Sequence, residues 1–150
     1  MGKRETLLCT ICGVKRKRGT ETEADKSDLE ALRGDESARR IARLVKNVNG
    51  VDCFVIFGNS GFAAYSNLTD SWLTNKVATL AFLLREIGNM MAAEVGKGEA
   101  ETITVCTKNG SGIVVYTKPC RMGNIAVVLD KHTKIGVLLY TLKHSHSKVE

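Results

Sequence analysis

The sequence lacks any long apolar run, and this absence limits where the protein can act. No stretch approaches the roughly 18 uninterrupted apolar residues that a membrane-spanning helix requires. The first six residues are polar, unlike the apolar centre of a signal peptide. We therefore expect a cytoplasmic protein without a membrane span.

A disulfide framework is also missing. The chain has five cysteines, an odd number without paired spacing, which is typical of a reducing compartment where thiols stay free. Cys53, Cys106 and Cys120 are expected to behave as small buried or half-buried hydrophobic residues. Cys9 and Cys12 have the Cys-x-x-Cys spacing of half a zinc site. No second cysteine pair lies nearby. Two interpretations therefore remain: free thiols in a flexible tail, or a zinc site that another chain completes. No other cofactor is expected.

Histidine is scarce, and this argues against an enzyme. The three histidines lie at or after the last predicted helix (His132, His144 and His146). A catalytic nucleophile needs a base within hydrogen-bond reach, and no such pair can be assembled from this sequence. The Gly-Asn-Ser-Gly segment at residues 58–61 lacks the spacing and the lysine of a phosphate-binding loop, and it joins two predicted strands. We expect neither catalysis nor nucleotide binding by the chain itself.

Positive charge is concentrated near the start of the chain. The formal net charge is +6, and residues 1–26 hold seven basic and four acidic residues, which is half of that excess. Four consecutive basic residues form a patch (Lys15, Arg16, Lys17 and Arg18). This patch could contact nucleic-acid phosphates or an anionic membrane, serve as a localisation signal, or simply be solvated. Residues 1–26 show no sustained period and are predicted to be a flexible extension, leaving residues 27–150 as one domain.

The spacing of apolar residues divides the first half of this domain into predicted helices and strands. Residues 27–30 read Ser-Asp-Leu-Glu, which is a capping box and predicts a short helix ending at Gly34. A second helix is predicted from Asp35, because apolar residues then recur at i, i+3, i+4 and i+7 until Asn49 and Gly50. Residues 52–57 form a continuous apolar run, as in an internal strand, and residues 62–66 predict the returning strand of a hairpin.

The second half contains the longest periodic segment, a predicted helix over residues 70–95. Its apolar face is wider than one sheet can cover, which favours burial against a second copy of the same helix. The alternative is that the two smaller helices cover it. Strands are predicted at residues 102–107, 113–117 and 124–129, with turns at residues 109–110 and 118–121, and a last helix contains Ile135, Leu138 and Leu142. The expected fold is α/β with a five-stranded antiparallel sheet.

Two segments carry a resemblance to a known family. Residues 44–67 read LVKNVNGVDCFVIFGNSGFAAYSN, and residues 124–142 read NIAVVLDKHTKIGVLLYTL. Together with the order of elements, they resemble the Roadblock dynein-light-chain family, which has a longin- or profilin-like fold. The resemblance covers residues 36–143, approximately the expected core. It implies a dimer joined through the long helix and an edge strand, with these residues at the interface: Val77, Leu80, Leu84, Ile87, Met91, Ile103 and Val105.

The resemblance also implies a function. Roadblock proteins are subunits of dynein-like motor complexes, or scaffolds and regulators of Ras-like small GTPases. We therefore expect a non-catalytic homodimer whose partner is such a GTPase or motor subunit. A second hypothesis is a nucleic-acid-binding protein that uses the basic, possibly zinc-bound extension and dimerises through the globular domain. A third is a small-molecule sensor of the PAS or GAF type, which would require a ligand-sized cavity within one subunit.

Overall fold

A single antiparallel sheet organises the domain in the computed structural model, which describes residues 6–8, 15–17, 23–120 and 123–145. The domain's elements in chain order are α1 (Glu23–Arg33), α2 (Glu36–Lys46), β3 (Val51–Gly58), β4 (Ala63–Ser66), α3 (Ser71–Glu94), β5 (Thr102–Cys106), β6 (Gly112–Cys120), β7 (Gly123–Leu129) and α4 (Ile135–His144). The strand order is β4-β3-β7-β6-β5. The expected five-stranded α/β fold is therefore confirmed.

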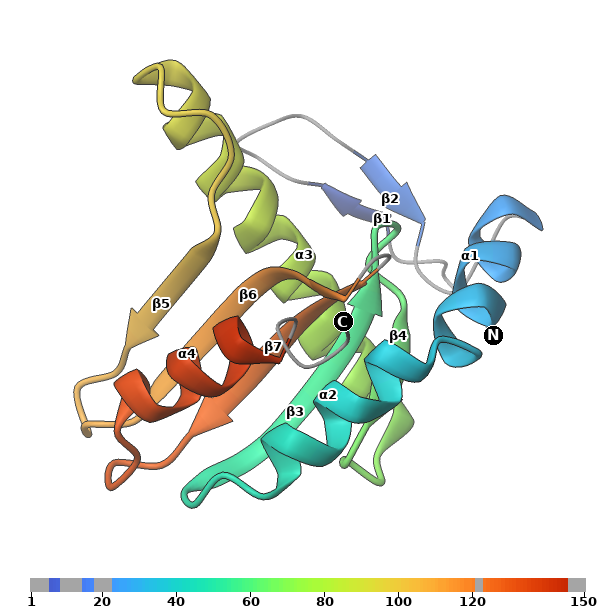
Figure 1. Ribbon diagram of the computed structural model, residues 1–150. Helices are drawn as coiled ribbons and strands as arrows, with labels where there is room; N and C mark the ends of the chain where they lie inside the picture. Colours follow the sequence, from blue (N-terminus) through green and yellow to red (C-terminus); the bar gives the residue numbers. More distant parts are fainter. Residues whose placement is uncertain (1–5, 9–14, 18–22, 121–122, 146–150) are drawn as a thin grey trace.

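Helices lie on both faces of this sheet, with α1, α2 and α4 on one face and α3 on the other (Figure 1). The period of two along β3 explains the two layers: Phe54 and Ile56 join the core under α1, α2 and α4, whereas Val55 and Phe57 pack with α3. Because α3 lies opposite the smaller helices, they do not cover its outer face. The alternative in which they bury that surface is wrong.

Two boundaries differ from the sequence prediction. The first helix, α1, begins at Glu23 rather than at a capping box, so Ser27 lies inside it and the predicted boundary at residue 26 falls within a helix. Residues 118–120, predicted as part of a turn, continue β6 instead. The pairing of β6 with β7 is irregular between Tyr116 and Cys120, the stretch that contains Pro119. A proline cannot donate to a strand ladder, which accounts for an irregularity there.

The N-terminal segment contains a separate two-stranded pair outside the main sheet. Strand β1 (Thr6–Leu8) pairs antiparallel with β2 (Lys15–Lys17). Three residues of the predicted basic patch therefore belong to β2, and Arg18 lies outside the described residues. Cys9 and Cys12 also lie outside them. The zinc site and the nucleic-acid contact accordingly stay predictions.

The start of α3 is fixed by Asp70, and its replacement gives a testable effect on stability. The Asp70 carboxylate accepts hydrogen bonds from the backbone N–H groups of Trp72 (2.9 Å) and Leu73 (3.3 Å). Asp70→Ala removes this cap and is expected to lower the free energy of unfolding by about 1 kcal/mol, measured by urea denaturation. Asp70→Asn keeps a side-chain oxygen in place and is the matched control. Equal losses in the two variants would contradict the capping role.

Candidate dimer and partner interface

The long helix α3 directs its small side chains inward and several large apolar ones outward. Its buried residues are Thr74, Ala78 and Ala81, and the two alanines pack in the core against the sheet. In contrast, Leu80 is 54% exposed and Met91 is 67% exposed. The other exposed large apolar residues of this helix and its end are Trp72, Leu73, Met90 and Val95. Exposed apolar residues that gather on one helix make this face of α3 a candidate interface.

Strand β5 lies beside this helix at the edge of the sheet. It pairs with β6 on one side, and the described residues place no strand on its other side. Gly88 of α3 allows a close approach, because a Cβ atom there would lie 2.9 Å from Cγ1 of Ile103. The Asn89 side-chain oxygen also accepts a hydrogen bond from the Ala100 backbone N–H at 2.8 Å. The C-terminal part of α3 and strand β5 are therefore close neighbours.

The predicted interface residues lie in three different settings in the structure. Leu80, Met91 and Val105 are exposed in the single subunit. Val77, Leu84 and Ile103 are partly buried and pack against the core between α3 and the sheet. Ile87 is half-buried and lines a cavity of about 590 Å³ near the end of α3, together with Met90, Met91, Ala93, Glu94 and Val95. The predicted interface did not include Val95, although Val95 continues the apolar pattern of the helix.

Three aromatic residues of the domain, Trp72, Tyr65 and Phe62, lie in different environments. Trp72 is 56% exposed and therefore lies outside the core, and the Lys76 ammonium nitrogen lies 4.6 Å from the centroid of its ring. Tyr65 is half-buried: its hydroxyl donates to the Arg33 carbonyl and accepts from Arg39 Nε at 3.2 Å. Tyr65 therefore holds α1 and α2 against β4. Phe62 is half-buried at the start of the returning strand.

Groups with shifted pKa values are scattered over the domain. Burial, followed by the nearby Asp52 charge, raises the pKa of the Cys53 thiol. Burial also raises the pKa of Tyr116, with a further contribution from its contact with Glu101. A backbone N–H from His132 lowers the pKa of Asp130, with the Thr133 hydroxyl adding to this effect. Each of these three shifts thus has its own local cause.

Of the remaining cysteines, Cys106 is exposed on β5 rather than buried, which corrects the prediction for it. Cys53 is half-buried and fits the prediction. In the described part of the chain, no group of three or more His, Cys, Asp or Glu side chains is arranged to hold a metal ion. Among the helices that the structure describes, none combines the length and apolar character needed to cross a membrane.

Comparisons with known proteins identify the architecture. No protein-family model matches the chain, and no curated protein sequence does. Solved structures do match, including the Roadblock/LC7 domain from Streptomyces avermitilis, with a TM-score of 0.64 and 20% identity over 74% of this chain and 92% of that one. The gliding protein MglB from Thermus thermophilus matches with a TM-score of 0.59 and 12% identity, over 73% and 82% of the two chains. Myxococcus xanthus MglB matches with a TM-score of 0.58 and 14% identity, over 87% and 90%. The chain therefore has the fold of the Roadblock/LC7 domains.

Proposed function

We propose that the chain is a non-catalytic, homodimeric protein-interaction module, joined through α3 and the outer edge of β5. The observation that carries this proposal is the distribution of side chains on α3, in which the fully buried residues are small and several large apolar residues, such as Leu80 and Met91, remain exposed. A second copy placed across a two-fold axis would cover the stripe with an identical stripe. It would also allow the two β5 strands to pair, which satisfies the open backbone groups at both edges.

The partner that we propose is a Ras-like small GTPase, which the dimer regulates or holds in place. The support is the Roadblock fold together with the family resemblance of residues 44–67 and 124–142. A subunit of a dynein-like motor complex is the other partner that this resemblance allows. In either case we propose that the chain contributes a binding surface, and the exposed apolar residues of α3 support this role.

A two-step binding experiment tests this proposal. The tagged full chain is used as bait in extracts of cells that produce it, and recovered proteins are quantified by mass spectrometry against a bait with Leu80→Glu and Met91→Glu. We expect a Ras-like GTPase or a motor subunit to be enriched with the unmodified bait. A recovered GTPase is then loaded with GDP or a non-hydrolysable GTP analogue, and binding is measured directly by calorimetry.

The results of this experiment test the proposed dimer interface and the proposed partner class separately. If the chain is a dimer but no GTPase or motor subunit is enriched, and loaded GTPases do not bind, the proposed partner class is wrong although the dimer stands. If the chain is monomeric and still binds the GTPase with the same affinity, the proposed interface is wrong instead. Preference for one nucleotide state would distinguish regulation from simple attachment.

A further inference from the structure

Alternate residues of strand β5 direct their backbone groups to opposite sides of the strand. The Glu101 carbonyl accepts a hydrogen bond from the Thr117 backbone N–H, and the Thr107 backbone N–H donates to the Ser111 carbonyl, both at 2.9 Å. Both bonds join β5 to β6, and in an antiparallel pair hydrogen-bonded and non-hydrogen-bonded residues alternate. The odd-numbered residues of β5 therefore bond to β6, and the backbone groups of the even-numbered residues point to the outer edge.

This outer set of backbone groups is short, because the residues that would extend it are engaged elsewhere. At one end, the Ala100 backbone N–H donates to the Asn89 side-chain oxygen at 2.8 Å, and the Ala100 carbonyl accepts from the Thr117 hydroxyl at 2.9 Å. At the other end, Lys108 already lies in the turn that leads to β6. The outer edge of β5 therefore offers the backbone groups of three residues, which we call the open ladder: Thr102, Thr104 and Cys106.

Two copies of a ladder of this length pair fully in one register only. Strands related by a two-fold axis across an edge run antiparallel, and each hydrogen-bonded pair of residues exchanges two bonds. With the axis at Thr104, Thr104 faces its own copy and Thr102 faces Cys106 of the partner subunit, so every residue of the open ladder is paired. An axis at Ile103 or at Val105 leaves one ladder residue of each subunit unpaired. Because lost hydrogen bonds weaken an interface, the register centred on Thr104 is favoured.

The same register matches the side chains on the α3 face of the sheet. Ile103 is partly buried against the core between α3 and the sheet, and Val105, two residues further along this face, is 38% exposed. With the axis at Thr104, Val105 of the partner subunit lies directly opposite Ile103, in a non-hydrogen-bonded pair whose side chains are close together. Each subunit would thus cover the exposed valine of the other.

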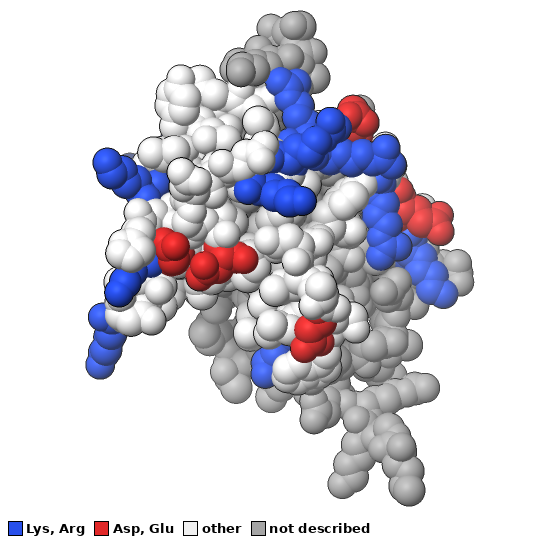
Figure 2. All heavy atoms as spheres, turned by 90° about the horizontal axis from the view of Figure 1, so that it is seen from below, with Lys and Arg blue, Asp and Glu red and all other residues white. Residues whose placement is uncertain are grey.

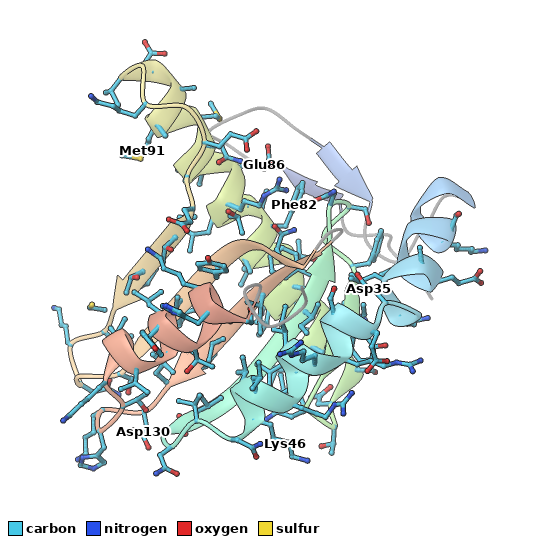
Figure 3. All side chains as sticks on the ribbon, in the orientation of Figure 1. Asp35, Lys46, Phe82, Glu86, Met91 and Asp130 are labelled. Atoms are coloured by element: carbon cyan, nitrogen blue, oxygen red, sulfur yellow. The ribbon has the colours of Figure 1, made fainter. Side chains whose placement is uncertain are left out.

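Charge does not oppose this pairing. The strand reads Thr-Ile-Thr-Val-Cys and carries no charged residue, although the chain has a net charge of +6. In the view from below, the largest group of lysine and arginine side chains lies at the upper right, toward α2 (Figure 2), whereas β5 forms the left edge of the sheet in Figure 1. Met91 lies on the part of α3 from which the chain turns back into β5 (Figure 3). Two copies can therefore approach along β5 without placing like charges opposite each other on this strand.

We propose that two copies of the chain join through β5 with the two-fold axis at Thr104, so that Val105 of the partner subunit packs on Ile103. This inference rests on the proposed function, since it specifies the strand contact of the proposed dimer residue by residue. It adds to that dimer a single register, in which the side chains on the other face are also fixed: Thr102 lies opposite Cys106 of the partner subunit, and Thr104 lies opposite its own copy.

Amide hydrogen exchange, measured by NMR on the isotope-labelled full chain, tests the open ladder residue by residue. The reference sample is the variant with Leu80→Glu and Met91→Glu, which is expected to be monomeric. In the dimer, the backbone N–H groups of the three ladder residues are expected to exchange at least about tenfold more slowly than in this variant. The N–H groups of Ile103 and Val105 bond to β6, so they should exchange slowly in both samples.

Contacts between α protons identify the register. A mixed dimer of carbon-labelled and unlabelled subunits is prepared, and an isotope-filtered NOE experiment then detects only the contacts between subunits. We expect a strong contact between the α protons of Ile103 and the partner's Val105, because α protons face each other in a non-hydrogen-bonded antiparallel pair. An axis at Ile103 or at Val105 would instead give a contact of that residue with its own copy.

A substitution at the axis tests the same contact through the affinity of the dimer. Thr104→Pro removes the backbone N–H of the central ladder residue in both subunits. Because this N–H points to the outer edge, where proline is tolerated, the fold should be preserved, and far-UV circular dichroism verifies this. The dissociation constant of the dimer, measured by sedimentation velocity, is expected to rise at least about tenfold. Thr104→Ala keeps the N–H and is the matched control, which should leave the dissociation constant nearly unchanged.

Three outcomes would overturn the proposal while the proposed function stands. The first is a dimer in which the ladder residues exchange as fast as in the monomeric variant, which would show that β5 stays open. The second is a set of α-proton contacts that belongs to another register. The third is equal dissociation constants for folded Thr104→Pro and Thr104→Ala dimers. A monomeric unmodified chain would instead overturn the proposed function, and this inference with it.

Discussion

Replacing Leu80 and Met91 together by glutamate is expected to convert the dimer into a folded monomer. Both side chains are more than half exposed in a single subunit, so the substitutions remove little from its core. In the dimer, each glutamate would have to leave water and face the apolar stripe of the partner subunit. With two charges per subunit, the dissociation constant of the dimer should rise at least about 100-fold, which corresponds to about 2.7 kcal/mol.

Sedimentation velocity over a range of protein concentrations measures this shift, and far-UV circular dichroism verifies that the fold is kept. Ser71→Glu with Asn75→Glu is the matched control, because both residues are exposed on α3 and the pair adds the same charge. At 100° per residue, these two positions lie on the side of the helix away from Leu80 and Met91. If the control dissociates as readily as the stripe variant, added charge rather than a lost apolar contact is responsible, and the proposed interface is wrong.

The order of elements could be predicted because each has a distinct period and a clear boundary. Asp35 and Asp70 precede apolar helical patterns, and in the structure both accept hydrogen bonds from the first turn of the following helix. Residues 52–57 are continuously apolar because β3 lies between two layers of helices. These signals are local in the sequence, so no knowledge of tertiary packing is needed to interpret them.

The orientation of α3 could not be predicted in the same way. Its apolar stripe includes Val77 and Leu84, which pack inward, as well as Leu80 and Met91, which do not. Periodicity shows that the apolar face is wide, but it does not show which part contacts the sheet. The deciding residues are Ala78 and Ala81, whose small size lets the helix approach β3 and β7 closely. Residues of low hydrophobicity contribute weakly to a periodic pattern, and so their role becomes visible only in the folded chain.

A groove of about 570 Å³ between the end of α2 and the start of α4 could not be predicted from the sequence either. Leu44 and Val48 belong to one predicted helix and Val137 to another, and each fits the apolar period of its own helix. Only the packing of α2 and α4 on the same face of the sheet brings them to one opening. The position of the Asp130 carboxylate beside this groove could not be predicted either. It is fixed by hydrogen bonds from the His132 backbone N–H and the Thr133 hydroxyl, which form only when the turn between β7 and α4 has folded.

That turn is packed against Gly50, where a single methyl group is expected to be severely destabilising. Gly50 has a φ angle of +86°, which is unfavourable for any residue with a Cβ atom. A Cβ built there would lie 1.8 Å from Thr133 Oγ1 and 2.9 Å from Asp130 Oδ1. The Gly50 carbonyl also accepts a hydrogen bond from the Asp130 backbone N–H at 2.8 Å. Alanine would therefore force the whole turn between β7 and α4 to move.

Gly50→Ala is expected to lower the free energy of unfolding by about 3 kcal/mol or more, from about 1–2 kcal/mol of backbone strain and the loss of hydrogen bonds in the turn. The measurement is urea denaturation followed by circular dichroism, in the Leu80→Glu and Met91→Glu background so that dissociation does not contribute. Gly96→Ala is the matched control, because φ at Gly96 is +70° and nothing lies within 4 Å of its built Cβ. This control should cost only about 1 kcal/mol, the strain alone. Equal losses at Gly50 and Gly96 would show that the turn can yield to a methyl group, and that its contact with Gly50 does not fix the position of α4.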